Sequence, residues 1–138
     1  MGFKQPENVP VGENSYRLTE DYIYEISSFL RVLVLSGFYW DGASVPKAFY
    51  WFLRRDGRIR AASLIHDAIY RNSPYLVLEA KSRALWVRGD RPINRETADK
   101  IFYNLMIEAG IPKWRADIAY RCVRIFGKKH WNGLPELA

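Results

Sequence analysis

Residues 61–70 read AASLIHDAIY and lie in the stretch of the chain with the clearest helical pattern. Its apolar residues recur every three or four positions, which predicts an amphipathic helix over 58–71. His66 follows the same spacing, so we expect it on the buried face of that helix. Asp67 is its neighbour in the chain, and Tyr70 lies one turn further on. The predicted helix therefore presents three chemically active side chains within five positions.

Two more helices are predicted on the C-terminal side of this stretch. Asn94 caps the first of them, and Gly110 ends it. Pro112 begins the second, which Gly127 ends. The remaining tail, residues 128–138, has no helical or strand period.

Strands are predicted on the N-terminal side. Residues 21–27 alternate as a half-buried strand, and residues 29–36 follow almost at once as a buried strand, so the two form a hairpin. Residues 1–15 are weakly patterned and are expected to form an extended arm. A glycine-containing loop over 37–46 then leads into a short helix that begins at Pro46.

The segment between the first two long helices is ambiguous. Residues 75–78 and 84–87 fit two strands around 79–83, and a helix over the middle also fits; we favour the hairpin. The predicted class is α+β, with a small N-terminal antiparallel sheet followed by about four packed α-helices. At 138 residues the chain is expected to be a single domain over 1–138.

Composition excludes several classes of protein. The formal net charge is +6, and 49% of the residues are hydrophobic, which excludes intrinsic disorder. Cys122 is the single cysteine, so an internal disulfide framework and a cysteine-rich zinc site are excluded. The chain begins without an apolar run, so we expect no signal peptide, and no stretch is long enough for a transmembrane segment. These features favour a protein made in a reducing cytoplasm.

Four sequence blocks resemble the DUF1353 family of uncharacterised proteins, which is common in tailed bacteriophages and prophages. The blocks are GFYWDGASVP at 37–46, AASLIHDAIY at 61–70, ADKIF at 98–102 and VRIFG at 123–127. The resemblance implies a phage or prophage origin, with the protein located in the host cytoplasm, the virion or both. It supplies no function, because the family is named for lacking one.

A second resemblance concerns chemistry. His-Asp-x-x-Tyr on one helix and Ala-Asp-x-x-Phe on a later helix are similar to motifs of the phospholipases A2. That resemblance implies that His66 is the general base that activates water and that Asp99 orients it. It further implies that Tyr70 supports Asp99 and that Asp67 binds Ca²⁺. The only upstream candidate for the family's calcium loop is residues 39–44, which contain one glycine where the family has several, and Asp41 within it is the second candidate metal ligand.

The physical chemistry of these residue types agrees with such a site. An imidazole is the natural base near neutral pH, and a carboxylate on its far nitrogen selects the tautomer and stabilises the imidazolium. Ca²⁺ prefers oxygen ligands and would polarise an ester carbonyl. The resemblance, with which these residue types agree, therefore implies a small hydrolase with phospholipase A2-like chemistry and Ca²⁺ as the candidate cofactor.

A structural interpretation stays open beside the enzymatic one. A histidine on an apolar helix face, paired with an aspartate and a tyrosine, also fits a buried polar network that fixes helix packing. The protein would then be a non-enzymatic phage accessory or virion component. Asp41 likewise fits either a site residue or a turn, and Ser44 is better explained as a helix cap than as a nucleophile.

Basic and aromatic residues suggest the kind of partner. Two loose basic groups have tryptophans nearby, namely Arg54, Arg55, Arg58 and Arg60, and Lys113, Arg115, Arg121, Arg124, Lys128 and Lys129. Such groups suit an anionic membrane surface, or a phage or host protein. Nucleic acid is less favoured because no recognised binding motif accompanies the charge. Solvated helix faces explain any single residue of these groups.

Overall fold

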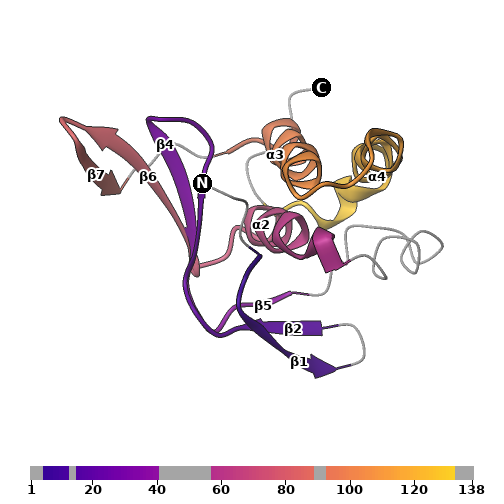
Figure 1. The fold of residues 1–138 in the computed structure, drawn as a ribbon, viewed down its shortest axis with the longest axis horizontal. Helices are drawn as coiled ribbons and strands as arrows, with labels where there is room; N and C mark the ends of the chain where they lie inside the picture. Colours follow the sequence, from indigo (N-terminus) through magenta and orange to yellow (C-terminus); the bar gives the residue numbers. More distant parts are fainter. Residues whose placement is uncertain (1–4, 13–14, 41–56, 89–92, 133–138) are drawn as a thin grey trace.

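The computed structural model of the chain describes residues 5–12, 15–40, 57–88 and 93–132. The fold is mixed α+β, as predicted, with two antiparallel sheets and, within the described residues, three α-helices. Figure 1 shows α2 in the middle of the molecule, with the longer sheet extending to one side and α3 and α4 lying on the other.

The helices match the periodic stretches of the sequence. They are α2 (Arg60–Tyr70), preceded by the 3-10 helix η1 (Gly57–Ile59), then α3 (Arg95–Glu108) and α4 (Lys113–Phe126), which continues into the 3-10 helix η2 (Gly127–His130). The expectation of about four α-helices is met only in part. The short helix predicted to begin at Pro46 lies outside the described residues, so three α-helices are described.

The ends of α3 follow the predicted capping chemistry. The Asn94 side chain accepts a hydrogen bond of 2.8 Å from the backbone N–H of Thr97, which satisfies one of the unpaired donors of the first turn. Gly110 follows the helix with φ +92°, a left-handed conformation that glycine adopts without a steric penalty. Local sequence therefore sets both ends of the helix that carries Asp99.

The longer sheet has the strand order β3-β4-β6-β7 and is antiparallel throughout. Its strands are β3 (Tyr22–Glu25), β4 (Leu30–Val34), β6 (Leu76–Ser82) and β7 (Leu85–Arg88). The hairpin predicted over 21–36 is confirmed. The hairpin favoured for the segment after α2 is also confirmed, and the helical alternative there is wrong. Its turn lies at Arg83 and Ala84, however, because most of the predicted connection over 79–83 is part of β6.

The predicted layout, with the sheet completed before the helices, is only partly right. β4 pairs with β6, which comes after α2, so this sheet is completed only beyond the first long helix. The pairing places Val32 opposite Leu78, and Val32 is fully buried. A local pattern indicates that a strand is half-buried, but it does not contain the identity of the strand's partner.

The second sheet is small and has the order β1-β2-β5. Its strands are β1 (Asn8–Gly12), β2 (Ser15–Leu18) and β5 (Tyr39–Trp40). Parts of the predicted arm over 1–15 and of the predicted loop over 37–46 are therefore paired strands. The buried Trp40 connects this sheet to α2, because its indole N–H donates to the Ser63 hydroxyl at 3.1 Å.

α2 is the central element of the core. Nine of its eleven residues are buried, as expected of a helix that is covered on nearly every side. Its neighbour α3 packs along it, and α4 packs against α3. Cys122 of α4 is a buried thiol, and burial raises its pKa. No helix in the described part of the chain combines the length and the apolar character needed to cross a bilayer.

Candidate functional site

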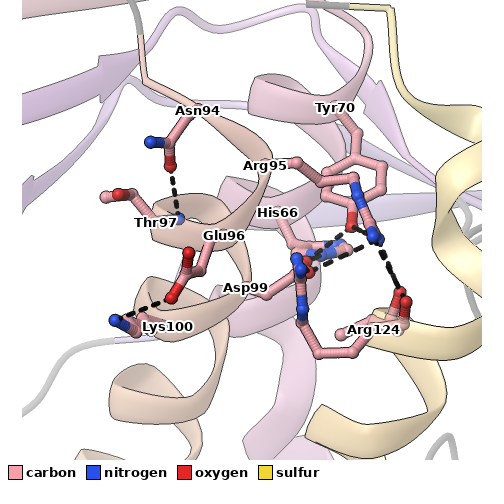
Figure 2. Close-up of polar contacts among 10 residues, drawn as sticks. His66, Tyr70, Asn94, Arg95, Glu96, Thr97, Asp99, Lys100 and Arg124 are labelled. Atoms are coloured by element: carbon pink, nitrogen blue, oxygen red, sulfur yellow. Dashed lines mark hydrogen bonds and ion pairs between the residues drawn. The ribbon is translucent and has the colours of Figure 1, made fainter. Parts of the chain in front are cut away.

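The packing of α2 against α3 brings together the three residues that the sequence predicts as catalytic. His66 Nε2 lies 2.7 Å from Asp99 Oδ1, and the Tyr70 hydroxyl donates to the same oxygen at 2.6 Å. His66 and Tyr70 are four residues apart on α2, so one helix face presents both of them to α3. Figure 2 shows the two side chains converging on Asp99.

Two arginines occupy the other side of the Asp99 carboxylate. Arg124 of α4 donates from Nη1 to Asp99 Oδ2 at 2.7 Å. Arg95, one turn before Asp99 on α3, places Nη1 3.6 Å from the same oxygen. Arg95 also donates to the Tyr70 hydroxyl at 3.2 Å. We call His66, Tyr70, Arg95, Asp99 and Arg124 the Asp99 cluster.

Arg95 further connects α3 to the end of α4. It donates to the carbonyl of Val123 at 3.1 Å and to the carbonyl of Arg124 at 3.2 Å. The Val123 carbonyl also accepts from the backbone N–H of Gly127, so the Arg95 guanidinium adds to the hydrogen bonds at the end of α4. A cation at this position also interacts favourably with the helix dipole. The same buried guanidinium helps to hold Asp99 in place.

The Asp99 cluster lies almost entirely within the core. His66 is 1% exposed and Asp99 0%, and the Arg124 side chain alone reaches the surface, with 30% exposed. Buried ions are tolerated where they are paired and hydrogen-bonded on all sides, and this arrangement meets that condition. The cluster therefore holds α2, α3 and α4 in one fixed arrangement.

Hydrogen bonds and charge set the ionisation state of Asp99 and, through it, the tautomer of His66. Burial raises the pKa of Asp99, but hydrogen bonds from His66, Tyr70 and Arg124 outweigh it and hold this pKa below the ordinary 3.8. The ionised carboxylate only accepts hydrogen bonds, so His66 Nε2 carries the hydrogen and donates it. A neutral His66 then has its lone pair on Nδ1, which is the tautomer that a general base requires.

Tyr70 is a neutral donor whose position depends on a glycine. Burial, and then the hydrogen bond and charge of Asp99, raise the pKa of Tyr70. A Cβ on Gly127 would lie 2.9 Å from the Tyr70 hydroxyl, closer than side-chain carbons approach. Gly127 was predicted to end α4, but its φ of −77° suits any residue. Glycine is required there because the chain passes directly over Tyr70.

Of the two predicted metal ligands, the structure describes Asp67. Asp67 is 3% exposed, and its Oδ2 lies 3.6 Å from Arg71 Nη2. Within the described residues there is no group of three or more His, Cys, Asp or Glu side chains that could hold a metal ion. Asp41, the second predicted ligand, and Ser44 lie outside the described residues.

Sequence reasoning missed Arg95 and Arg124 as members of the site. Arg95 carried a signal, because it stands four residues before Asp99 on a predicted helix, the spacing at which ion pairs form. Arg124 was counted among the surface basic residues. Only the packing of α4 against α3 shows that its guanidinium turns inward to Asp99.

Comparison with known proteins places the chain in a family. No curated protein and no solved structure gave a significant match. A family model described as "Protein of unknown function (DUF1353)" matches residues 16–123. This range is well over half of the 138 residues and includes His66, Tyr70 and Asp99, while Arg124 is the first residue beyond it. The chain therefore belongs to the DUF1353 family.

Proposed function

We propose that this protein is a small hydrolase with phospholipase A2-like chemistry, in which His66 is the general base. The observation that carries the proposal is the 2.7 Å contact between His66 Nε2 and Asp99 Oδ1, an oxygen that Tyr70 also contacts. This contact selects the tautomer with its lone pair on Nδ1. Such an arrangement accelerates reactions by about 10²–10⁴-fold when the base meets its substrate.

The proposed reaction is hydrolysis of an ester by water. Nδ1 of His66 removes a proton from water while the water oxygen bonds to the ester carbonyl carbon. Asp99 stabilises the imidazolium that forms, and Tyr70 and Arg124 hold Asp99 in position. The tetrahedral intermediate then breaks its bond to the leaving alkoxide. His66 returns the proton to that alkoxide, so the enzyme ends in its starting state.

In this proposal, Asp67 would be a ligand of Ca²⁺. A bound Ca²⁺ would polarise the ester carbonyl and stabilise the developing oxyanion. Ca²⁺ takes six to eight oxygen ligands, and among the described residues only Asp67 is a candidate carboxylate next to the dyad. These residues do not form a calcium site by themselves, so the calcium requirement is a separate question for experiment.

A second candidate function rests on burial. His66 is 1% exposed and Asp67 3%, so a substrate reaches His66 Nδ1 only if the packing around the ring opens. The ring is also covered by aromatic neighbours, with the centroid of Phe102 4.7 Å away and that of Tyr70 4.0 Å away. These facts favour a non-enzymatic phage accessory or virion component, in which the Asp99 cluster only fastens the helices together.

The biological setting is part of the proposal. The resemblance of the four sequence blocks to DUF1353 proteins of tailed phages supports a phage or prophage origin. The protein would then act in the host cytoplasm, in the virion or in both. Both candidate functions fit that setting.

The decisive experiment measures hydrolysis of phosphatidylglycerol vesicles, with Ca²⁺ and with a chelator. His66→Gln removes the base, and His130→Gln is the matched control, because His130 is the only other histidine and lies in η2. The hydrolase proposal predicts turnover in the wild type and the control, and a loss of at least 100-fold in His66→Gln. Circular dichroism and melting temperatures check that the variants are folded.

Each outcome decides between the two functions. Turnover that requires both Ca²⁺ and His66 supports the complete proposal, and turnover that requires His66 alone removes calcium from it. No turnover by a folded wild-type protein, combined with a lower melting temperature of His66→Gln, favours the structural cluster. In His66→Gln, a buried group of the cluster that loses its hydrogen bond would lower the free energy of unfolding by about 1–3 kcal/mol.

A further inference from the structure

The solvent-facing side of α4 carries a line of apolar side chains. Trp114, Ile118 and Ile125 are 59%, 37% and 68% exposed, and Arg121 lies between them. Their spacing of four, three and four residues places all four side chains along one face of the helix. That face points away from the buried residues of α4, such as Ala119 and Val123. We call these four residues the α4 stripe.

Positive charge surrounds the stripe. Residues 113–130, which form α4 and η2, contain six Lys or Arg and one Asp, a net +5 within a chain whose formal net charge is +6. Two of these cations have carboxylate partners, since Lys113 pairs with Asp117 at 2.9 Å and Arg124 with Asp99 at 2.7 Å. Further cations, among them Arg121, Lys128 and Lys129, are exposed.

We propose that α4 and η2 dock the protein on a membrane surface that contains anionic lipid. An apolar line between cations is the arrangement that suits the boundary between acyl chains and headgroups, with aromatic and aliphatic residues below and basic residues at the level of the phosphates. Trp114 at one end of the helix is the residue type that prefers this boundary. The charge of the segment complements anionic headgroups.

The same features argue against the other occupants of this surface. A two-fold symmetric contact along α4 would place the η2 lysines of one copy near the basic N-terminal turn of the other copy's α4, which contains Lys113 and Arg115, and like charges repel. Nucleic acid would use the cations, but it has no medium in which to bury Ile118 and Ile125. A lipid surface uses both the charge and the apolar side chains.

Docking is independent of the proposed chemistry. None of the side chains of the α4 stripe belongs to the Asp99 cluster, and vesicle binding is measured without turnover. His66→Gln is therefore expected to bind vesicles as the wild type does. Failure of the hydrolase proposal leaves docking intact, and failure of docking leaves hydrolysis of soluble esters to be measured.

The test is co-sedimentation of the full chain with vesicles of phosphatidylglycerol or of phosphatidylcholine, at low and high salt. Ile125→Glu places a charge in the stripe, and Leu85→Glu is its matched control. Both residues are aliphatic and equally exposed, at 68% and 69%, and Figure 1 shows α4 and β7 at opposite ends of the molecule. Arg121→Gln and Arg88→Gln form a second pair, which tests charge.

We expect binding to phosphatidylglycerol that weakens with salt, and much weaker binding to phosphatidylcholine. Ile125→Glu should weaken binding at least tenfold and Arg121→Gln about fivefold, while both β7 controls bind as the wild type. Melting temperatures of all four variants should match the wild type, because the changed side chains are exposed.

Other outcomes overturn the proposal. The lipid assignment is wrong if the folded wild type fails to sediment with anionic vesicles, or if Ile125→Glu and Leu85→Glu reduce binding equally. Binding of duplex DNA that Arg121→Gln weakens and Ile125→Glu leaves unchanged would assign the surface to nucleic acid. A dimer in light scattering that Ile125→Glu dissolves would assign it to a second copy.

Discussion

The helical part of the molecule and the β6-β7 hairpin differ in which side chains they bury: the helices bury charged side chains, whereas the hairpin exposes apolar ones. In the helical part, α2, α3 and α4 enclose two charged side chains, Asp99 and Arg95, which are 0% and 4% exposed. In the hairpin, Leu85 is 69% and Val87 47% exposed. Figure 1 shows the hairpin extending away from the helices.

The two regions also differ in how their conformation is held. The helices are tied together by contacts between residues far apart in the chain, such as the Arg124–Asp99 pair at 2.7 Å. The hairpin turns at Arg83 and Ala84, both with positive φ, at 49° and 68°. Removal of one buried partner therefore leaves other buried ions uncompensated, whereas a change in the hairpin stays local.

Removal of the Asp99 carboxylate should have the largest effect. Asp99→Ala leaves Arg95 buried without its acid, so we expect a loss of about 3–5 kcal/mol in the free energy of unfolding, measured by urea denaturation. Glu79→Ala is the control, because the Arg31–Glu79 ion pair of 2.8 Å lies on the sheet with both side chains partly exposed. The control should lose about 1 kcal/mol or less. Equal losses in both variants would remove the distinction between the two regions.

Substitution of Gly127 should have the next largest effect. Gly127→Ala places a Cβ 2.9 Å from the Tyr70 hydroxyl and 3.1 Å from its Cε2, and the resulting shift should cost about 1–3 kcal/mol. Tyr70→Phe removes the nearer of these atoms. The double variant should therefore be more stable than the sum of the single effects predicts. Strictly additive losses in thermal melts would show that the two residues do not meet.

Acid should weaken the helical part through the same carboxylate. The pKa of Asp99 in the folded state is below its ordinary 3.8, so its contribution to stability is complete above about pH 4 and is lost as the pH falls through the folded value. In urea denaturation between pH 6 and 2.5, the wild type should lose more stability than Asp99→Asn. Parallel curves would mean that Asp99 is not held in its ionised form.

Alkali should also destabilise the fold, through tyrosines that are buried or partly buried. Burial and the nearby Glu108 carboxylate raise the pKa of Tyr24 to about 12, and burial with Asp99 raises that of Tyr70. The neutral forms are favoured in the folded state, so stability is complete below about pH 10 and falls as the pH rises further. Tyr70→Phe should flatten part of this decline, which absorbance at 295 nm and denaturation can follow.

The smallest expected effect lies at the tip of the hairpin. Ala84 has φ 68°, which glycine adopts without strain, so Ala84→Gly should stabilise the turn by about 0.5–1 kcal/mol. Ala80→Gly, in the middle of β6, is the control and should destabilise by a similar amount. Hydrogen exchange of the hairpin amides measures both changes. Faster exchange in Ala84→Gly would contradict the assigned turn.

Much of the local structure could be predicted from the sequence. The three described α-helices follow apolar spacing and capping residues, and His66 lies on the buried face as its position predicted. The hairpin over residues 21–36 follows strand alternation. These features depend on residues within a few positions of one another, and such neighbours are visible in a linear sequence.

The candidate site could be predicted only in part. His66, Tyr70 and Asp99 were expected together because of a resemblance, and the structure brings them within hydrogen-bond distance. Arg95 and Arg124 were not expected, although they contribute the positive charge that surrounds Asp99. An arginine at the edge of the apolar face of a helix can point its side chain either to solvent or into the core. Which of the two it does depends on the helix that packs beside it.

The helix ends to within about two residues, the α+β class and the inward orientation of His66 all follow from local sequence. The pairing of β4 with β6 beyond α2, the place of β1 in a sheet and the inward turn of Arg124 to Asp99 depend on tertiary packing. The physical reason is that capping and periodicity act over one or two turns of chain. Strand partners and buried ion pairs are selected by the burial of surfaces from distant segments, and that selection is made only when those segments pack together.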